Sequence, residues 1–546
     1  EIHERLVGSE MCIRDSIKMR YYIFRNNTLE PLFGNLDARY SGYGDISSLE
    51  EGADRYIWFY QVPFGFDRCR VAEEVLSYID KLRWVIEKIP AHKSVLVFSL
   101  VDLCPFQWAG SEWEVQESIE TYNKYLRSLA SERSNVRYVD LPDFTRRYSS
   151  SQLFDWRFYF ISQMGINPKL ASDFSCWFED RLREISLCRK KCLVLDLDNT
   201  LWGGVLGEDG IDGIKIGGDY PGKAFLYFQE GLLELAKRGV ILTICSKNNE
   251  RDVLDLWEKN PFVLLRKEHF SAWRINWRNK ADNIRELSEE LNIGLDSLVF
   301  VDDNPTEREL VRQMLPMVEV PEFPKQSYML PDFLISLSDR YFRVYSVTEE
   351  DRRKTEQYKA NASRTQERKK FVDFDQYLQS LEIEMRIEPM NSFNVSRIAQ
   401  MTQKTNQFNL TTRRCSESDL MGFSSEGWLI YCLSVKDRFG DNGITGAVLL
   451  RPIDGGYEID SFLLSCRILG KGIEEAFLSG ILNILRNRGV KLVKASYIPT
   501  AKNMQVSGFY ERTDFVLDSQ DKDGSKFYHL NMGAEIKIPS YYKITY

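Results

Sequence analysis

The chain has 546 residues, of which 43% are hydrophobic and 28% charged, and its formal net charge is −8. Such a length exceeds what one core supports and predicts about three or four domains. The acidic balance argues against a dedicated nucleic-acid-binding protein, and no apolar run approaches the roughly 20 residues that cross a bilayer. Four dispersed histidines argue against a histidine-based zinc site. Ten cysteines without a Cys-x-x-Cys pair, and no recognisable signal peptide, predict reduced thiols in the cytoplasm.

The first residues are set apart from the rest of the chain. Residues 1–18 show little periodicity, whereas Met19 precedes the apolar run 21–24, which predicts a first strand. We therefore interpret residues 1–18 as a non-native leader and exclude them from the fold prediction.

Residues 19–188 alternate short apolar runs with amphipathic helical patterns. Runs at 56–60, 94–99 and 136–140 predict strands, and the patterns at 71–89 and 118–129 predict helices between them. This alternation predicts an α/β sandwich. Its order resembles the SGNH-hydrolase-like N-terminal part of FkbH-like proteins.

A hydrolase of the SGNH type needs a Gly-Asp-Ser nucleophile turn and a late Asp-x-x-His. The corresponding early turn, Arg25 to Leu29, has no Gly-Asp-Ser, and no Asp-x-x-His occurs before residue 190. We therefore expect this N-terminal domain to serve as a scaffold or a recognition module and not to catalyse.

A second alternation covers residues 189–345. Apolar runs at 192–195, 240–245, 262–265 and 297–301 predict four strands, and helices are expected at 223–238, from residue 250 onward, and at 280–291. Strands and helices at this spacing predict a doubly wound parallel sheet. In such sheets ligands bind outside the carboxyl ends of the strands.

Polar residues stand at these strand ends and at one helix start. The candidate catalytic and metal-binding residues are Asp196, Asp198, Ser246, Lys280, Asp302 and Asp303. Asp196 and Asp198 are two residues apart, so on extended backbone their carboxylates face the same way. Like charges so close favour a divalent cation between them, or protonation of one. These residues form four sequence elements in chain order: Asp196-x-Asp198, Ser246, Lys280 and Asp302-Asp303. Together they resemble the haloacid-dehalogenase (HAD) phosphotransferase superfamily, although each alone is common in loops and surface helices.

The resemblance and the residue chemistry together suggest a role for each carboxylate. Asp196 would attack phosphorus as the nucleophile, and Asp198 would act as general acid and then general base. Mg²⁺ would be held by Asp196, Asp302 and the backbone carbonyl of Asp198. Asp303 is either a further ligand or a residue that orients the ligands.

Ser246 and Lys280 would bind phosphoryl oxygens, and Lys280 would also neutralise charge on Asp196. Residues 196–210, 244–249 and 300–305 resemble the FkbH-like branch of this superfamily. The resemblance implies that a glyceryl unit from 1,3-bisphosphoglycerate loses its phosphate and is loaded as a thioester on an acyl carrier protein. Such a reaction suits polyketide or surface-polysaccharide biosynthesis. Cys245 is a possible thiol for this transfer, but a buried cysteine is more often inert packing.

Residues 346–546 resemble a GNAT-type acyltransferase domain. Arg467, Gly470 and Gly472 fit an Arg-x-x-Gly-x-Gly pattern between a predicted strand at 457–464 and a predicted helix at 473–486. Backbone amides at such a helix start would receive the pyrophosphate of CoA, or of carrier-bound phosphopantetheine.

Further downstream, Asn503 and Tyr510 resemble the segment in which GNAT domains place a general acid, although Tyr510 fits an ordinary core tyrosine as well. The polar run 403–414 is either a solvated loop or a surface that recognises pantetheine amides.

The expected fold is therefore α/β and multidomain, with a HAD-like sheet between an SGNH-like and a GNAT-like domain. One functional reading is the FkbH-like enzyme. An alternative is a HAD phosphatase of a small phosphorylated metabolite fused to a CoA-dependent acyltransferase. A third interpretation treats the outer domains as recognition modules around one HAD phosphatase.

Overall fold

The computed structural model describes residues 19–546 except positions 92, 134, 186–188, 346, 348–356, 359, 361–363, 365–366, 368–370, 372, 406–407, 466–467, 501–502, 534–537 and 540. The predicted leader and Arg467 thus lie outside the described residues. The described chain forms two compact units, one within residues 10–186 and 416–422 and the other within 187–415 and 423–546. No helix in the described part combines the length and the apolar character that crossing a membrane requires.

Within the described residues, the N-terminal unit contains a five-stranded parallel sheet of order β2-β1-β3-β4-β5. Its strands are β1 (Arg20–Arg25), β2 (Asp37–Tyr43), β3 (Arg55–Phe59), β4 (Ser94–Phe98) and β5 (Val136–Val139). Its longer helices are α2 (Arg68–Lys88), α3 (Glu114–Glu132) and α7 (Ala171–Ile185). The strands and helices predicted here are confirmed, whereas the edge strand β2 was not predicted.

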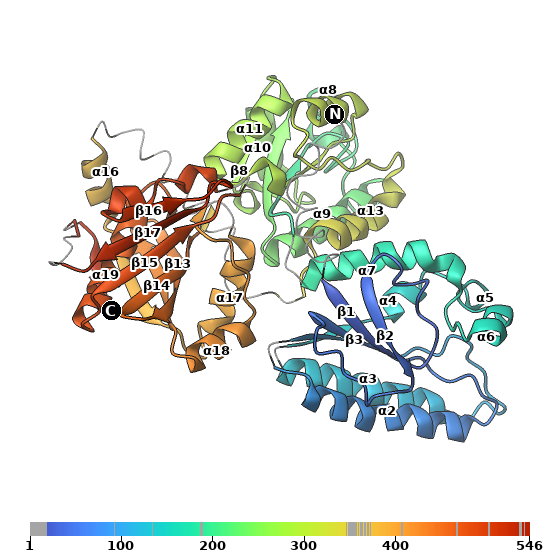
Figure 1. Cartoon of the computed structure of the whole chain (residues 1–546). Helices are drawn as coiled ribbons and strands as arrows, with labels where there is room; N and C mark the ends of the chain where they lie inside the picture. The colour runs from blue at the N-terminus through green and yellow to red at the C-terminus, as the bar shows by residue number, and fades with distance from the viewer. Residues whose placement is uncertain are drawn as a thin grey trace. The chain divides into compact units, whose positions relative to one another are not determined.

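Both faces of this sheet are buried. Tyr22 and Trp58 pack in one cluster with residues of α2 and α3, and Ile23 and Phe59 pack in a second cluster with residues of α7. Figure 1 shows α2 and α3 on one side of the strands and α7 on the other. Alternate residues of each strand therefore face different helices.

The second unit contains, in its described part, a four-stranded parallel sheet of order β8-β7-β6-β9. Its strands are β6 (Cys192–Leu195), β7 (Ile241–Ser246), β8 (Ala272–Ile275) and β9 (Leu298–Val301). Its helices are α8 (Leu206–Gly213), α9 (Gly222–Lys237), α10 (Glu250–Lys259), α11 (Lys280–Leu291), α12 (Pro305–Met314) and α13 (Leu330–Leu337). Leu193 packs with α9 and α10, and Val194 with α11. The doubly wound parallel sheet is confirmed.

The strand predicted at 262–265 is wrong, because the third strand is β8. Val263 and Leu265 are buried, but they belong to a loop. The backbone N–H groups of Leu264 and Leu265 both donate to Oε1 of the buried Gln229, at 2.9 and 2.9 Å. A side chain on α9 thus satisfies donors that a neighbouring strand would otherwise have to satisfy.

The same unit also holds a mixed sheet, whose described strands follow the order β16-β17-β15-β14-β13-β12-β10-β18, with β11 on β14. They are β10 (Glu384–Pro389), β11 (Phe408–Asn409), β12 (Leu429–Asp437), β13 (Gly440–Ile453), β14 (Gly456–Leu464), β15 (Leu492–Tyr497), β16 (Val516–Gln520), β17 (Lys526–Asn531) and β18 (Lys543–Thr545). The helices around it are α16 (Phe374–Leu381), α17 (Val395–Lys404), α18 (Glu417–Ser425) and α19 (Ile473–Asn487). Strand β14 and helix α19 match the prediction. Two parallel sheets and one mixed sheet confirm that the fold is α/β and multidomain.

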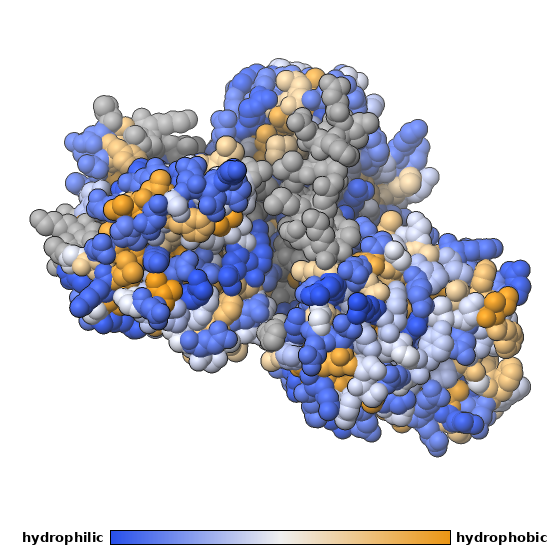
Figure 2. All heavy atoms as spheres, in the orientation of Figure 1, coloured by the Kyte–Doolittle hydropathy of each residue, from blue (hydrophilic) through white to orange (hydrophobic). Residues whose placement is uncertain are grey.

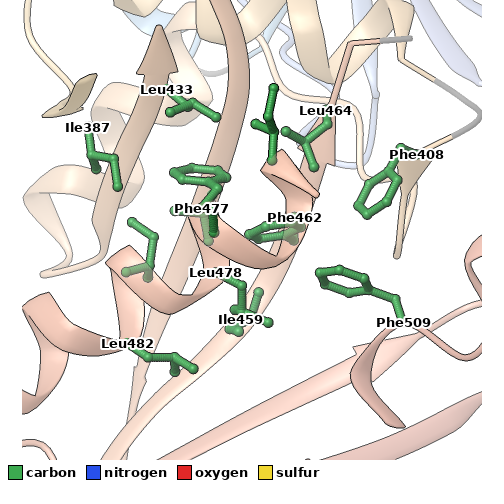
Figure 3. Close-up of a cluster of buried hydrophobic side chains, with 14 of the residues drawn as sticks. Ile387, Phe408, Leu433, Ile459, Phe462, Leu464, Phe477, Leu478, Leu482 and Phe509 are labelled. Carbon is green, nitrogen blue, oxygen red and sulfur yellow. The ribbon is translucent and has the colours of Figure 1, made fainter. Parts of the chain in front are cut away.

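The core of the mixed sheet is rich in aromatic residues. Phe462 of β14 lies between Phe477 of α19 and Phe509, with ring centroids 5.1 and 5.5 Å away (Figure 3). Phe408 of β11 joins this cluster and is 4% exposed. The visible outer face, in contrast, is largely hydrophilic, with scattered hydrophobic patches (Figure 2).

Candidate active site

The predicted catalytic residues meet at the carboxyl edge of the HAD-like sheet. Strands β6 and β9 are in register, with Leu195 opposite Val301, so that Asp196 and Asp302 each follow one member of a pair. The backbone N–H of Asp196 donates to the carbonyl of Val301 at 3.0 Å. The register alone therefore brings the two carboxylates together.

Three carboxylates form a group that fits a divalent cation. Oxygen atoms of Asp196, Asp302 and Asp303 lie within 4.8 Å of one another. Oδ1 of Asp196 is buried and has no hydrogen-bond partner among the described residues. Hard carboxylate oxygens are the ligands that Mg²⁺ prefers, and an unpaired buried anionic oxygen is costly without a cation. These residues therefore fit Mg²⁺.

Lys280 supplies a fixed positive charge beside this group. Its ammonium lies 2.6 Å from Oδ2 of Asp302 and 3.0 Å from Oδ2 of Asp196, and all three side chains are buried. Burial alone would lower the pKa of Lys280, but the two carboxylates outweigh burial and raise it. The side chain therefore stays charged and neutralises part of the acidic cluster.

Burial, and after it the nearby charge of Asp196, raise the pKa of Asp302 and of Asp303 to about 6. Lys280 opposes these shifts in part. Both causes, burial and the charge of Asp196, disfavour the ionised carboxylates, and a bound cation would favour them. The same physical causes are typical of functional sites.

The loop that carries Asp302 and Asp303 is held by a residue that sequence reasoning missed. Nη1 of Arg308 donates to the carbonyl oxygens of Asp302 and Asp303, at 2.8 and 2.7 Å. The backbone N–H of Asp303 donates to Oγ1 of Thr200 at 3.2 Å. Arg308 follows Asp302 by six residues on the first turns of α12, a spacing that gave no recognisable signal.

Asp198 lies outside the three-carboxylate group and accepts hydrogen bonds instead. Burial raises its pKa, although donors from Leu206, Asn248 and Trp202 act in the opposite direction. Ser246 ends β7, as predicted, and is buried. The structure thus brings all six predicted HAD residues to one sheet edge.

Cys245, the possible thiol, is fully buried beneath this edge. Its Sγ lies 3.6 Å from the carbonyl oxygen of Lys280. Burial raises the pKa of the thiol far above its usual range, although Lys280 opposes the shift. A thiolate is the reactive form, so these observations argue for packing, and the thioester role stays a prediction.

The predicted turn at Gly470 and Gly472 stands before α19, as expected. Both glycines adopt positive φ, at 72° and 66°. The N–H of Gly470 donates to Oε1 of Glu474, and the hydroxyl of Tyr542 donates to the carbonyl of Lys471. The chain's own side chains therefore contact this turn.

Asn503 and Tyr510 are both buried. The Asn503 side chain accepts from the N–H of Thr500 at 2.7 Å and donates to the carbonyls of Asn409 and Ile498, each at 2.9 Å. The Tyr510 hydroxyl has no hydrogen-bond partner among the described residues, and burial raises its pKa well above its usual value. These contacts are structural, and the acyl-binding roles of both residues stay predictions.

Part of the polar run 403–414 is built into the mixed sheet, whereas Arg413 and Arg414 are exposed. Phe408 and Asn409 form β11, opposite Leu464 and Leu463 of β14. On the other side, the N–H of Ile498 donates to the carbonyl of Leu410 at 2.8 Å. The run therefore inserts backbone between β14 and the segment that follows β15.

Residues 191–346 match the model of the NLI interacting factor-like phosphatase family. No curated protein matches the chain. The chain therefore carries a HAD-like phosphatase domain, whose residues include the three-carboxylate group.

Among solved structures, the chain is similar to the N-terminal part of the protein BF1531 from Bacteroides fragilis, which contains a phosphatase domain and was crystallised as a complex with Mg. The two are 28% identical, with a TM-score of 0.52, over 62% of this chain and 100% of that chain.

The chain is also similar to ribosomal-protein-S18-alanine N-acetyltransferase from Escherichia coli, at 14% identity and a TM-score of 0.22, over 29% of this chain and 97% of that chain. PaiA N-acetyltransferase from Thermoplasma acidophilum, in complex with coenzyme A, is 12% identical with a TM-score of 0.21, over 27% of this chain and 98% of that chain.

Proposed function

We propose that the chain is a Mg²⁺-dependent phosphatase of a small phosphorylated metabolite, in which Asp196 is the nucleophile. The observation that carries this proposal is the Asp196 carboxylate, which has one oxygen on Lys280 and the other buried without a hydrogen-bond partner among the described residues. The phosphatase family match over 191–346 and the magnesium complex of the Bacteroides fragilis protein support it. Mg²⁺ held by Asp196, Asp302 and Asp303 would neutralise charge between nucleophile and phosphate.

The residues divide the reaction into two steps. The Asp196 carboxylate attacks phosphorus, the bond from phosphorus to the ester oxygen breaks, and Asp198 gives its proton to that oxygen. Asp198 then takes a proton from water, which attacks the same phosphorus and breaks its bond to Asp196. Phosphate leaves, and both carboxylates return to their starting states. Ser246 and Lys280 bind phosphoryl oxygens throughout.

Phosphate release from a panel of phosphomonoesters, with Mg²⁺ and with EDTA, tests this function. We expect release by the wild-type chain with Mg²⁺ and none by Asp196→Asn. Asp255→Asn, an exposed residue of α10, is the matched control and should keep full activity. Release that survives Asp196→Asn would overturn the nucleophile assignment.

The C-terminal sheet motivates a second candidate, in which phosphate removal is coupled to acyl transfer. The turn at Gly470 and Gly472, directly before α19, supports a CoA-dependent acyltransferase activity, since amides at a helix start bind phosphates. The finer form of this proposal, suggested by the motif at 196–210, is glyceryl loading from 1,3-bisphosphoglycerate onto an acyl carrier protein. Intact-mass measurement of a carrier incubated with enzyme, Mg²⁺ and 1,3-bisphosphoglycerate tests it, and a carrier that gains no glyceryl mass would refute it.

A further inference from the structure

The two oxygens of Asp198 are held unequally. Oδ1 accepts two hydrogen bonds, from Nε1 of Trp202 at 2.9 Å and from the N–H of Leu206 at 3.0 Å. Oδ2 accepts one, from Nδ2 of Asn248 at 2.8 Å. A carboxylate oxygen has two lone pairs. Among the described residues, Oδ2 therefore keeps one lone pair open, whereas both lone pairs of Oδ1 are used.

Asn248 also lies against the phosphoryl-binding hydroxyl. Its Nδ2 is 3.4 Å from Oγ of Ser246, and its side chain is buried. Trp202 and Leu206 are near Asp198 in sequence and hold it within its own turn, whereas Asn248 reaches it from the loop after β7. One amide group therefore links the carboxylate to the serine.

An amide N–H₂ group acts only as a donor. The Asn248 amide therefore needs a free lone pair of Oδ2 to donate to. A proton cannot occupy that same lone pair. The proton carried by Asp198 then occupies the remaining lone pair of Oδ2. The direction of this lone pair depends on where Asn248 holds the carboxylate.

We propose that Asn248 is a positioning residue that fixes Oδ2 of Asp198 as the proton-carrying oxygen beside Ser246. This inference rests on the proposed phosphatase function and assigns a role to a residue that the reaction steps above do not use. Asn248 contacts Oδ2 of Asp198 but transfers no proton itself, so it acts through Asp198.

Leaving-group dependence distinguishes this role from a structural one. Alkyl phosphates expel a basic oxygen that needs a proton, whereas 4-nitrophenyl phosphate expels a stabilised phenolate. General acid catalysis contributes roughly 10²–10⁴-fold, so a misplaced acid should cost an alkyl phosphate at least about tenfold in kcat. The loss for 4-nitrophenyl phosphate should stay within about threefold, because that leaving group gains little from the acid.

The experiment compares kcat and KM of wild type, Asn248→Ala and the isosteric Asn248→Asp for both substrates with Mg²⁺. We expect a selective loss of kcat on the alkyl phosphate in both variants, with KM nearly unchanged. Asn249→Ala is the matched control, since its side chain contacts Trp277 and Asp252 and not Asp198. A folded variant that loses activity equally on both substrates would overturn the proposal.

A double mutant supplies a second criterion. In the Asp198→Asn background, Asn248→Ala should cause no further loss on the alkyl phosphate, because the acid it positions is already gone. A full additional loss would overturn the proposal. If neither wild type nor Asp196→Asn cleaves either substrate, the proposed phosphatase function itself fails, and the inference fails with it.

Discussion

Replacement of Lys280 by methionine tests whether this buried ammonium neutralises the acidic cluster. The ammonium lies 2.6 and 3.0 Å from two buried carboxylates, and its side chain is 3% exposed. Breaking a buried ion pair by removing one partner costs about 3–5 kcal/mol. For a domain of roughly 150–250 residues, 1 kcal/mol corresponds to about 2–4 °C in Tm. We therefore expect Lys280→Met to lower the Tm by roughly 6–20 °C in EDTA.

Thermal denaturation of the full chain at pH 7.5, with EDTA and with excess Mg²⁺, measures this effect. Because the variant leaves more uncompensated negative charge, Mg²⁺ should raise its Tm by more than it raises the Tm of wild type. Lys259→Met is the matched control, since its pair with Asp255 is exposed and worth at most about 0.5 kcal/mol. A variant as stable as wild type in EDTA would refute the role of Lys280.

Three further predictions concern pH, packing and a buried amide. Since the pKa values of Asp302 and Asp303 are raised to about 6, Mg²⁺ affinity measured by titration calorimetry should fall as pH drops below 6, by about tenfold per unit for each protonated ligand. Gly165→Ala would place a Cβ 2.1 Å from a buried glutamine oxygen and should cost about 1–3 kcal/mol in urea denaturation. Gly110→Ala, with nothing within 4 Å, should be neutral. Gln229→Leu leaves one carbonyl and two N–H groups unsatisfied and should lower stability by at least about 3 kcal/mol. Wild-type stability in Gly165→Ala or in Gln229→Leu would contradict the reasoning for that variant.

The position of the candidate site could be predicted because most of its residues stand at the end of a recognisable apolar run or open a helix. Asp196 and Asp302 follow β6 and β9 without a gap, and Lys280 begins α11. The carboxyl ends of parallel strands share one edge of the sheet. We can therefore predict that these residues meet without knowing the course of the loops between them.

Features that depend on contacts between distant residues could not be predicted. The run 262–265 has the composition of a strand, but its backbone bonds to side chains, among them that of Gln229, which is 35 residues from Leu264 in the sequence. Strand β2 carries mostly exposed and polar residues and lacks the apolar signal of a buried strand. Asn248 lies within the motif at 244–249, but its hydrogen-bond partner, Asp198, is 50 residues away in the sequence. The motif alone therefore does not predict this contact.

The two residues of β11 have a consequence for solubility. Strand β14 pairs with β15 only over Gly456–Ile459, and β11 covers its end at Leu463 and Leu464. Without β11, this apolar end would expose an unpaired edge to other chains. A protease cut or deletion in the 403–414 run is thus a route to intermolecular strand pairing and aggregation, even where the phosphatase site is intact.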